Sequence, residues 1–92
     1  MYSAPETYVL HDNYPIPFNP TTTIRFELPT ASTISLVVYD VLGREVVLLT
    51  KEELEAGLHQ VTWTASNLPN GTYFYRLQAG EMIQTKHMTL LK

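Results

Sequence analysis

The sequence contains no cysteine, so neither a disulfide scaffold nor a thiolate metal site can form. It also lacks any run of about 20 apolar residues, the length that a membrane-spanning helix needs. Basic residues number only 6 against 9 acidic ones, and a net charge of -3 gives no electrostatic basis for binding nucleic acid. No glycine-rich phosphate loop or nucleophile-elbow serine is present. We therefore expect no cofactor, no nucleic-acid partner and no enzymatic activity.

The composition is that of a small folded domain. Hydrophobic residues make up 45% and charged residues 16% of the 92 residues, which is a globular rather than a disordered balance. A chain of this length forms one domain with a thin core. We expect residues 8–92 to be that domain, and residues 1–7 to be a linker with Met1 as an added start. The signal peptide of an exported parent protein would lie outside this sequence.

Short runs of alternating apolar and polar residues, separated by turn residues, extend along the chain. The clearest is Thr21–Leu28, where Ile24 and Phe26 alternate with polar side chains. Similar runs predict further strands at 8–10, 32–40, 44–49, 58–64, 72–79 and 82–91, with a charged loop at 51–55. These strands predict an all-β, antiparallel, seven-stranded immunoglobulin/fibronectin III-like β-sandwich without a disulfide.

The proline-rich segment 13–20 cannot be a central strand, because proline donates no backbone hydrogen bond. We expect it to be an extended edge segment with Tyr14 and Phe18 tucked into the sandwich. Trp63 is expected in the core rather than on a sugar-binding platform, since it shares a strand face with Val61. The apolar outer face near Val37 and the unpaired edge strands are compatible with a homodimer.

Few residues have the spacing that metal binding or recognition requires. The three histidines are His11, His59 and His87, and none of them has a second ligand at metal-site spacing. Asp12, Asn13 and Asn19 carry oxygens that suit Ca²⁺, but such residues more often form turns around prolines. Lys86 shares strand parity with the apolar Met88, so we expect its aliphatic stem to lie on the sandwich and its amine to reach water. Alternatively, Lys86 is a recognition charge on the last strand. Tyr73 is expected to send its hydroxyl back to upstream backbone, as in a tyrosine corner.

Three segments together resemble the motifs of one protein family. Segment 13–20, Asn-Tyr-Pro-Ile-Pro-Phe-Asn-Pro, resembles its opening Tyr-Pro-Asn-Pro motif, with Ile16 where the family usually has Asn. Segment 38–45 resembles its central Tyr-Asp-x-x-Gly-Arg motif. Segment 71–77, followed by Lys86 and Lys92, resembles its closing Gly-x-Tyr…Lys motif. The chain is thus similar to the type A C-terminal sorting domain of the type IX secretion system of Bacteroidetes-like bacteria.

This resemblance implies a signal that sends a folded periplasmic cargo protein to the cell surface or the medium. The implied partners are an outer-membrane translocon, its shuttle protein and a surface sortase that removes the domain and attaches the cargo. The residues that match motif positions are Tyr14, Pro15, Pro17, Asn19, Tyr39, Asp40, Gly43, Arg44, Gly71, Tyr73, Lys86 and Lys92. Arg44, Lys86 and the last strand are the expected recognition elements, with docking through an edge or terminal strand.

Two other functions are open at this point. The central and closing segments also resemble the immunoglobulin-like domain of the flagellar hook-capping protein, an assembly and spacer module. A carbohydrate-binding or spacer module of a multidomain surface protein or glycoside hydrolase is the third alternative. The short link between Trp63 and Pro69 favours the sorting domain.

Overall fold

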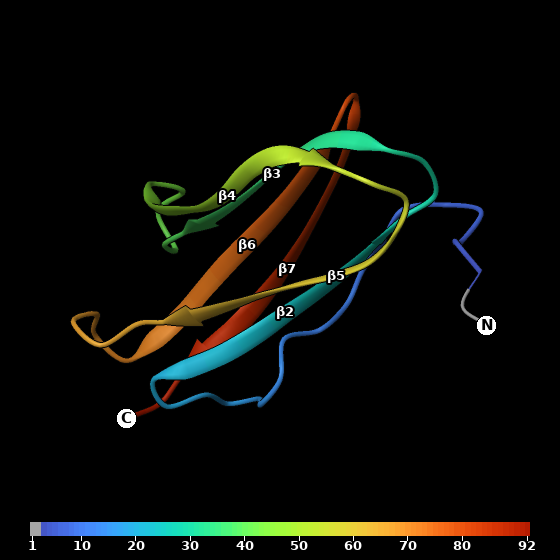
Figure 1. The fold of residues 1–92 in the computed structure, drawn as a ribbon. Coiled ribbons are helices and arrows are strands. Elements are labelled where there is room, and N and C mark those ends of the chain that lie inside the picture. The colour runs from blue at the N-terminus through green and yellow to red at the C-terminus, as the bar shows by residue number, and fades with distance from the viewer. Residues whose placement is uncertain (1–2) are drawn as a thin grey trace.

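The computed structural model describes residues 3–92, which form seven strands in two antiparallel sheets. The strands are β1 (Val9–Leu10), β2 (Thr21–Leu28), β3 (Ser32–Tyr39), β4 (Glu45–Leu54), β5 (Gly57–Thr64), β6 (Gly71–Ala79) and β7 (Met82–Leu90). One sheet has the order β1-β2-β5 and the other β4-β3-β6-β7. The sheets lie face to face (Figure 1), with Cα extents of 38 × 27 × 17 Å. The predicted all-β sandwich is confirmed.

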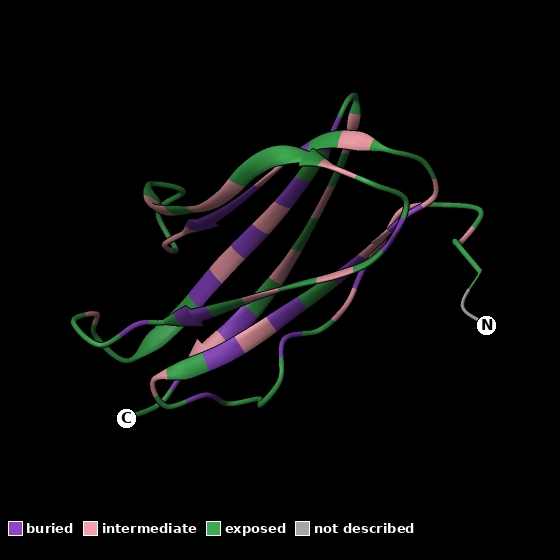
Figure 2. Cartoon of the chain, viewed as in Figure 1, coloured by how far each residue is buried: buried purple, intermediate pink, exposed green. Residues whose placement is uncertain are grey.

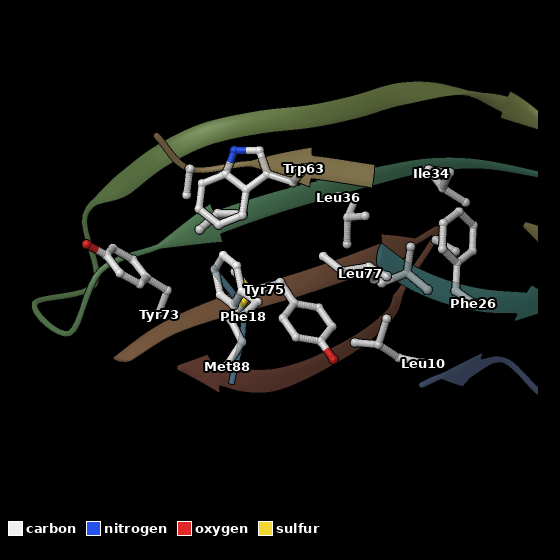
Figure 3. Packing of buried hydrophobic residues seen from close by; sticks show 14 of the residues in the cluster. Leu10, Phe18, Phe26, Ile34, Leu36, Trp63, Tyr73, Tyr75, Leu77 and Met88 are labelled. Atoms are coloured by element: carbon white, nitrogen blue, oxygen red, sulfur yellow. The ribbon is translucent and has the colours of Figure 1, made fainter. Parts of the chain in front are cut away.

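The core lies between the sheets and is built from alternate positions of the strands. Figure 2 shows this alternation as bands of buried and less buried residues along β2 and β6. Ile24, Phe26 and Leu28 are fully buried, as the pattern of β2 predicts. They belong to one hydrophobic cluster with side chains of the other sheet, among them Leu36 and Leu77, which Figure 3 shows together with Phe26. Burying one such side chain stabilises the fold by roughly 1.5–3 kcal/mol.

The proline-rich segment between β1 and β2 ties the two sheets together. The backbone of Tyr14 exchanges two hydrogen bonds with Thr23 of β2, of 2.9 and 2.8 Å. Further along, the Phe18 N–H donates to the Thr89 carbonyl and the Phe18 carbonyl accepts from Leu91, both at 3.0 Å. One segment therefore pairs with β2 of one sheet and with the end of β7 in the other.

Two predictions about side chains and strands were wrong. Tyr14 was expected in the sandwich, but its side chain is 75% exposed, because its backbone makes the contacts with β2. The charged segment 51–55 was expected to be a loop, but residues 51–54 continue β4 and pair with β3. At an exposed strand edge the charged side chains reach water, so charge does not oppose the backbone pairing there.

Other expectations about burial are met. Phe18 is 1% and Trp63 9% exposed, so both lie in the core.

Residues 3–7 of the predicted linker form no strand, and residues 1 and 2 lie outside the described part of the chain. On the outer face of β3, Val37 is buried by its own neighbours, since it lies opposite Leu48 of β4 and Arg76 of β6.

We predict that Phe18→Ala destabilises the domain by about 3–5 kcal/mol, because it opens a cavity between the sheets. Ile16→Ala is the matched control, since Ile16 belongs to the same segment but is 55% exposed. Urea unfolding followed by fluorescence measures both free energies of unfolding. Equal and small losses in the two variants would contradict the role given to Phe18.

Candidate recognition site

The turn between β3 and β4 is held by the side chain of Asp40. Its Oδ1 accepts hydrogen bonds from the backbone N–H groups of Leu42 and Arg44, at 2.9 and 3.0 Å. Its Oδ2 accepts from Arg44 Nε at 2.8 Å. The backbone closes the same turn, with Asp40 N–H donating to the Arg44 carbonyl and Gly43 N–H to the Asp40 carbonyl, both at 3.0 Å. Gly43 has a φ of 80°, which explains why glycine stands there.

These contacts favour the ionised form of Asp40. The backbone N–H of Arg44 contributes most to holding the pKa of Asp40 below its ordinary value of 3.8. The Arg44 side chain and the Leu42 N–H add to the effect, and partial burial opposes it. The central motif is thus a turn that its own carboxylate makes rigid.

The loop before β6 is held by a tyrosine corner. The Tyr73 hydroxyl donates to the Pro69 carbonyl at 2.7 Å, the upstream hydrogen bond that the sequence predicts. Lys92 adds two contacts to this loop, through its backbone N–H to Asn70 Oδ1 at 2.9 Å and through Nζ to the Ser66 carbonyl at 3.1 Å. The closing motif therefore fixes the loop that precedes it.

The Asp40 turn and the loop before β6 face each other across a surface hollow of about 440 Å³. Asp40 and Arg44 line one side of it, and Pro69, Gly71 and Tyr73 line the other. Figure 1 shows both loops at the same end of the sandwich, with the C-terminus nearby. We call this end, with residues 40–44 and 68–73, the loop end.

The opening motif joins the loop end through a chain of aromatic rings. The rings of Phe18 and Trp63 are 5.9 Å apart, and those of Trp63 and Tyr73 are 6.4 Å apart in an edge-on arrangement (Figure 3). A residue from each of the opening and closing motifs thus packs on the one tryptophan. This packing also leaves Trp63 unavailable as a sugar platform.

The other motif residues do not gather at the loop end. Lys86 lies opposite Tyr75 of β6 with its side chain 38% exposed, and its Nζ lies 3.1 Å from Asp12 Oδ1. Tyr39 lies on the outer face of the four-stranded sheet. The opening motif also contributes residues whose side chains are exposed: Tyr14, Pro15, Pro17 and Asn19. The structure therefore brings together Asp40, Gly43, Arg44, Gly71, Tyr73 and Lys92, but not the whole set.

Several of the residues considered for metal binding have protein partners. His11 Nε2 lies 2.6 Å from Glu27 Oε2, and His59 Nε2 lies 2.7 Å from the Glu55 carbonyl. Asn13 is buried and donates from Nδ2 to the Pro15 carbonyl and to Thr22 Oγ1. Within residues 3–92 no group of three or more His, Cys, Asp or Glu side chains is placed to hold a metal ion.

Two residues of the loop end were missed by the motif comparison. Val41 and Leu42 occupy the variable positions of the Asp-x-x-Gly turn, and they are 65% and 72% exposed. Two adjacent apolar residues in a turn are unusual, because turns favour small and polar side chains. That contrast with turn chemistry is the signal in the sequence that could have marked them.

We predict that Asp40→Asn lowers the free energy of unfolding at neutral pH. The folded-state pKa of Asp40 is lowered, so the carboxylate's contribution is present above 3.8 and is lost as the pH falls through the folded-state pKa. The difference between wild type and D40N should therefore shrink as the solution is acidified. Urea unfolding over that pH range measures it, with the exposed Glu53→Gln as control. A difference that stays constant with pH would show that the charge does not hold the turn.

Comparison with known proteins adds the family. The model of the secretion system C-terminal sorting domain matches residues 12–90, which is most of the chain. No curated protein matches the sequence. The described residues contain no helix with the length and apolarity needed to cross a membrane. Because the family model matches far more than half of the chain, including the opening and central motifs, the chain belongs to the family of C-terminal sorting domains of the type IX secretion system.

Proposed function

We propose that the export machinery recognises this sorting domain at the loop end, and that a surface sortase then removes the domain and attaches the cargo. The family supplies the coarser function, export through the type IX system. The translocon, its shuttle protein and the sortase are the partners of this proposal. The single observation that carries the proposed site is the exposure of Val41 and Leu42 on a turn that Asp40 makes rigid.

Exposed apolar side chains at the tip of a rigid turn favour binding to another protein. Val41 and Leu42 cost free energy by their contact with water, and a partner's apolar pocket would recover it. The hydrogen bonds of Asp40 fix the backbone before binding, so little conformational entropy is lost in the complex. The neighbouring hollow of about 440 Å³ offers space for a side chain of the partner.

Docking by strand addition to the four-stranded sheet is less favoured than docking at the loop end. The outer edge of β7 is partly occupied, because Phe18 bonds to residues 89 and 91. Gln84 bonds to the backbone of Leu10 and Tyr8 with its side chain, covering another part of that edge. On the other edge, the β4 pairing with β3 is interrupted by two register shifts and carries charged residues, features that discourage strand pairing.

The test is a fusion of residues 8–92 to a reporter with a signal peptide, in a host with a type IX system. We expect the reporter at the cell surface or in the medium, with a mass that shows loss of the domain. A fusion that stays in the periplasm like the reporter alone would overturn the sorting function. A fusion that is exported at full mass would overturn the proposed removal.

The same fusion tests the proposed site. We expect the double variant Val41→Ser and Leu42→Ser to lower the exported amount by about tenfold or more, since hot-spot side chains cost more than 1 kcal/mol when they are lost. Leu58→Ser is the matched control, because Leu58 is a 50% exposed leucine on β5, in the other sheet. Equal export by the two variants would place recognition elsewhere.

Lys86 needs a test that separates recognition from folding. If its ion pair with Asp12 only supports the fold, Lys86→Ala and Asp12→Ala should have equal effects on stability and on export. If the amine is itself recognised, Lys86→Ala should lower export while Asp12→Ala does not. The contacts in the structure predict the first result, with a loss of stability of about 1 kcal/mol or less for this partly exposed pair. Thermal unfolding and the export assay together decide between the two.

A further inference from the structure

The outer face of the four-stranded sheet carries a group of apolar and aromatic residues where a polar face is typical. The register places Tyr39 of β3 beside Phe74 of β6, and Val37 beside Arg76. Val37 is only 8% exposed although it lies on this outer face, and Tyr39, Phe74 and Arg76 are half-buried. With Thr85 of β7, which lies opposite Arg76, these residues form what we call the Arg76 face.

The guanidinium of Arg76 is held in place on this face. Its central carbon lies 4.6 Å from the centre of the Tyr39 ring, and Nη2 donates a hydrogen bond to the Tyr39 hydroxyl. A cation over an aromatic ring is stabilised by the ring's quadrupole, and the flat guanidinium suits this geometry. Arg76 has therefore already lost much of the side-chain freedom that binding would otherwise remove.

Arg76 has no carboxylate partner among residues 3–92. The acidic residue that shares its surface hollow is Asp40, whose oxygens are occupied by Arg44 and by the backbone of the turn. The hollow measures about 350 Å³ and is lined by Tyr39, Phe74, Arg76, Thr85 and the turn after β3. A half-buried cation, fixed in direction and without a carboxylate partner among the described residues, thus stands at an open hollow lined by both apolar and polar side chains.

We propose that the Arg76 face binds an acidic side chain, flanked by apolar residues, on a protein of the export machinery. The guanidinium fork can donate two parallel hydrogen bonds to one carboxylate, and Phe74 and Val41 supply apolar contacts for its neighbours. A protein carboxylate fits better than an anionic lipid surface, because the domain's net charge of -3 repels a uniformly anionic surface. This proposal rests on the proposed function for the partner's identity, but its binding chemistry can be measured separately.

The first test is an NMR titration of the full chain with the capped tripeptide acetyl-Val-Glu-Leu-amide. We expect shift changes at Tyr39, Phe74, Arg76 and Thr85, with a millimolar dissociation constant. The peptide with Gln in place of Glu should bind about tenfold more weakly or worse, because the charge-assisted hydrogen bonds are lost. Equal binding of the two peptides, or shift changes confined to other surfaces, would overturn the proposal.

Variants of the two arginines provide the control. Arg76→Gln should abolish the preference for the Glu peptide, and Arg76→Lys should weaken it, since lysine keeps the charge without the fork. Arg25→Gln removes one positive charge from β2, in the other sheet, and should bind the Glu peptide like wild type. A wild-type preference for Glu in folded Arg76→Gln would overturn the proposal, and thermal unfolding verifies the fold.

The second test places Arg76→Gln and Arg25→Gln in the reporter fusion. We expect lower export for Arg76→Gln alone. If the unsubstituted fusion is not exported, the proposed function fails, while the peptide titration still decides the binding chemistry. If the unsubstituted fusion and Arg76→Gln are exported equally, the role of the face in export is refuted and the proposed function stands. Phosphatidylglycerol vesicles provide the lipid control. If they bind in an Arg76-dependent way and the Glu peptide does not bind selectively, the face binds lipid and the proposed protein partner is wrong.

Discussion

The side chain of Phe18 fills the space between the two sheets, while its backbone bonds to the end of β7. The packing of this side chain and the bonding of this backbone both depend on the proline-rich segment, which cannot join a sheet as an ordinary strand. Phe18 packs on Trp63, which in turn packs on Tyr73, the anchor of the loop before β6. The shape of the loop end therefore depends on a residue that lies far from it in the sequence. In a domain with so thin a core, few other contacts could replace this one.

The sequence predicts the features that depend on local pattern. The alternation in β2 gives its buried face, and Asp-x-x-Gly gives a turn before β4. It does not predict that residues 51–54 continue β4, because that depends on pairing with β3 rather than on their own charge. Tyr14 is exposed because its backbone, and not its side chain, contacts β2, and the sequence pattern does not specify which of the two makes that contact. The stacking of Arg76 on Tyr39 depends on the register between two strands that are distant in the chain.

Family membership and structure explain different parts of the motifs. Gly43, Asp40 and Tyr73 have a direct structural reason, since each fixes a turn or loop by backbone geometry or hydrogen bonds. Motif residues of this kind would be retained by any chain that must build the same loop end. Val41 and Leu42, which stand at the unspecified positions of the central motif, are the residues that the rigid turn presents to solvent.

The start of the described chain and the loop end lie at opposite ends of the long axis of the sandwich (Figure 1). A sorting domain at the C-terminus of its protein follows the cargo, so the cargo joins at the end away from the Asp40 turn. The long axis of the domain, with a Cα extent of 38 Å, therefore separates the cargo from the loop end. A cargo protein held at that distance would leave the Asp40 turn and the loop before β6 open to solvent.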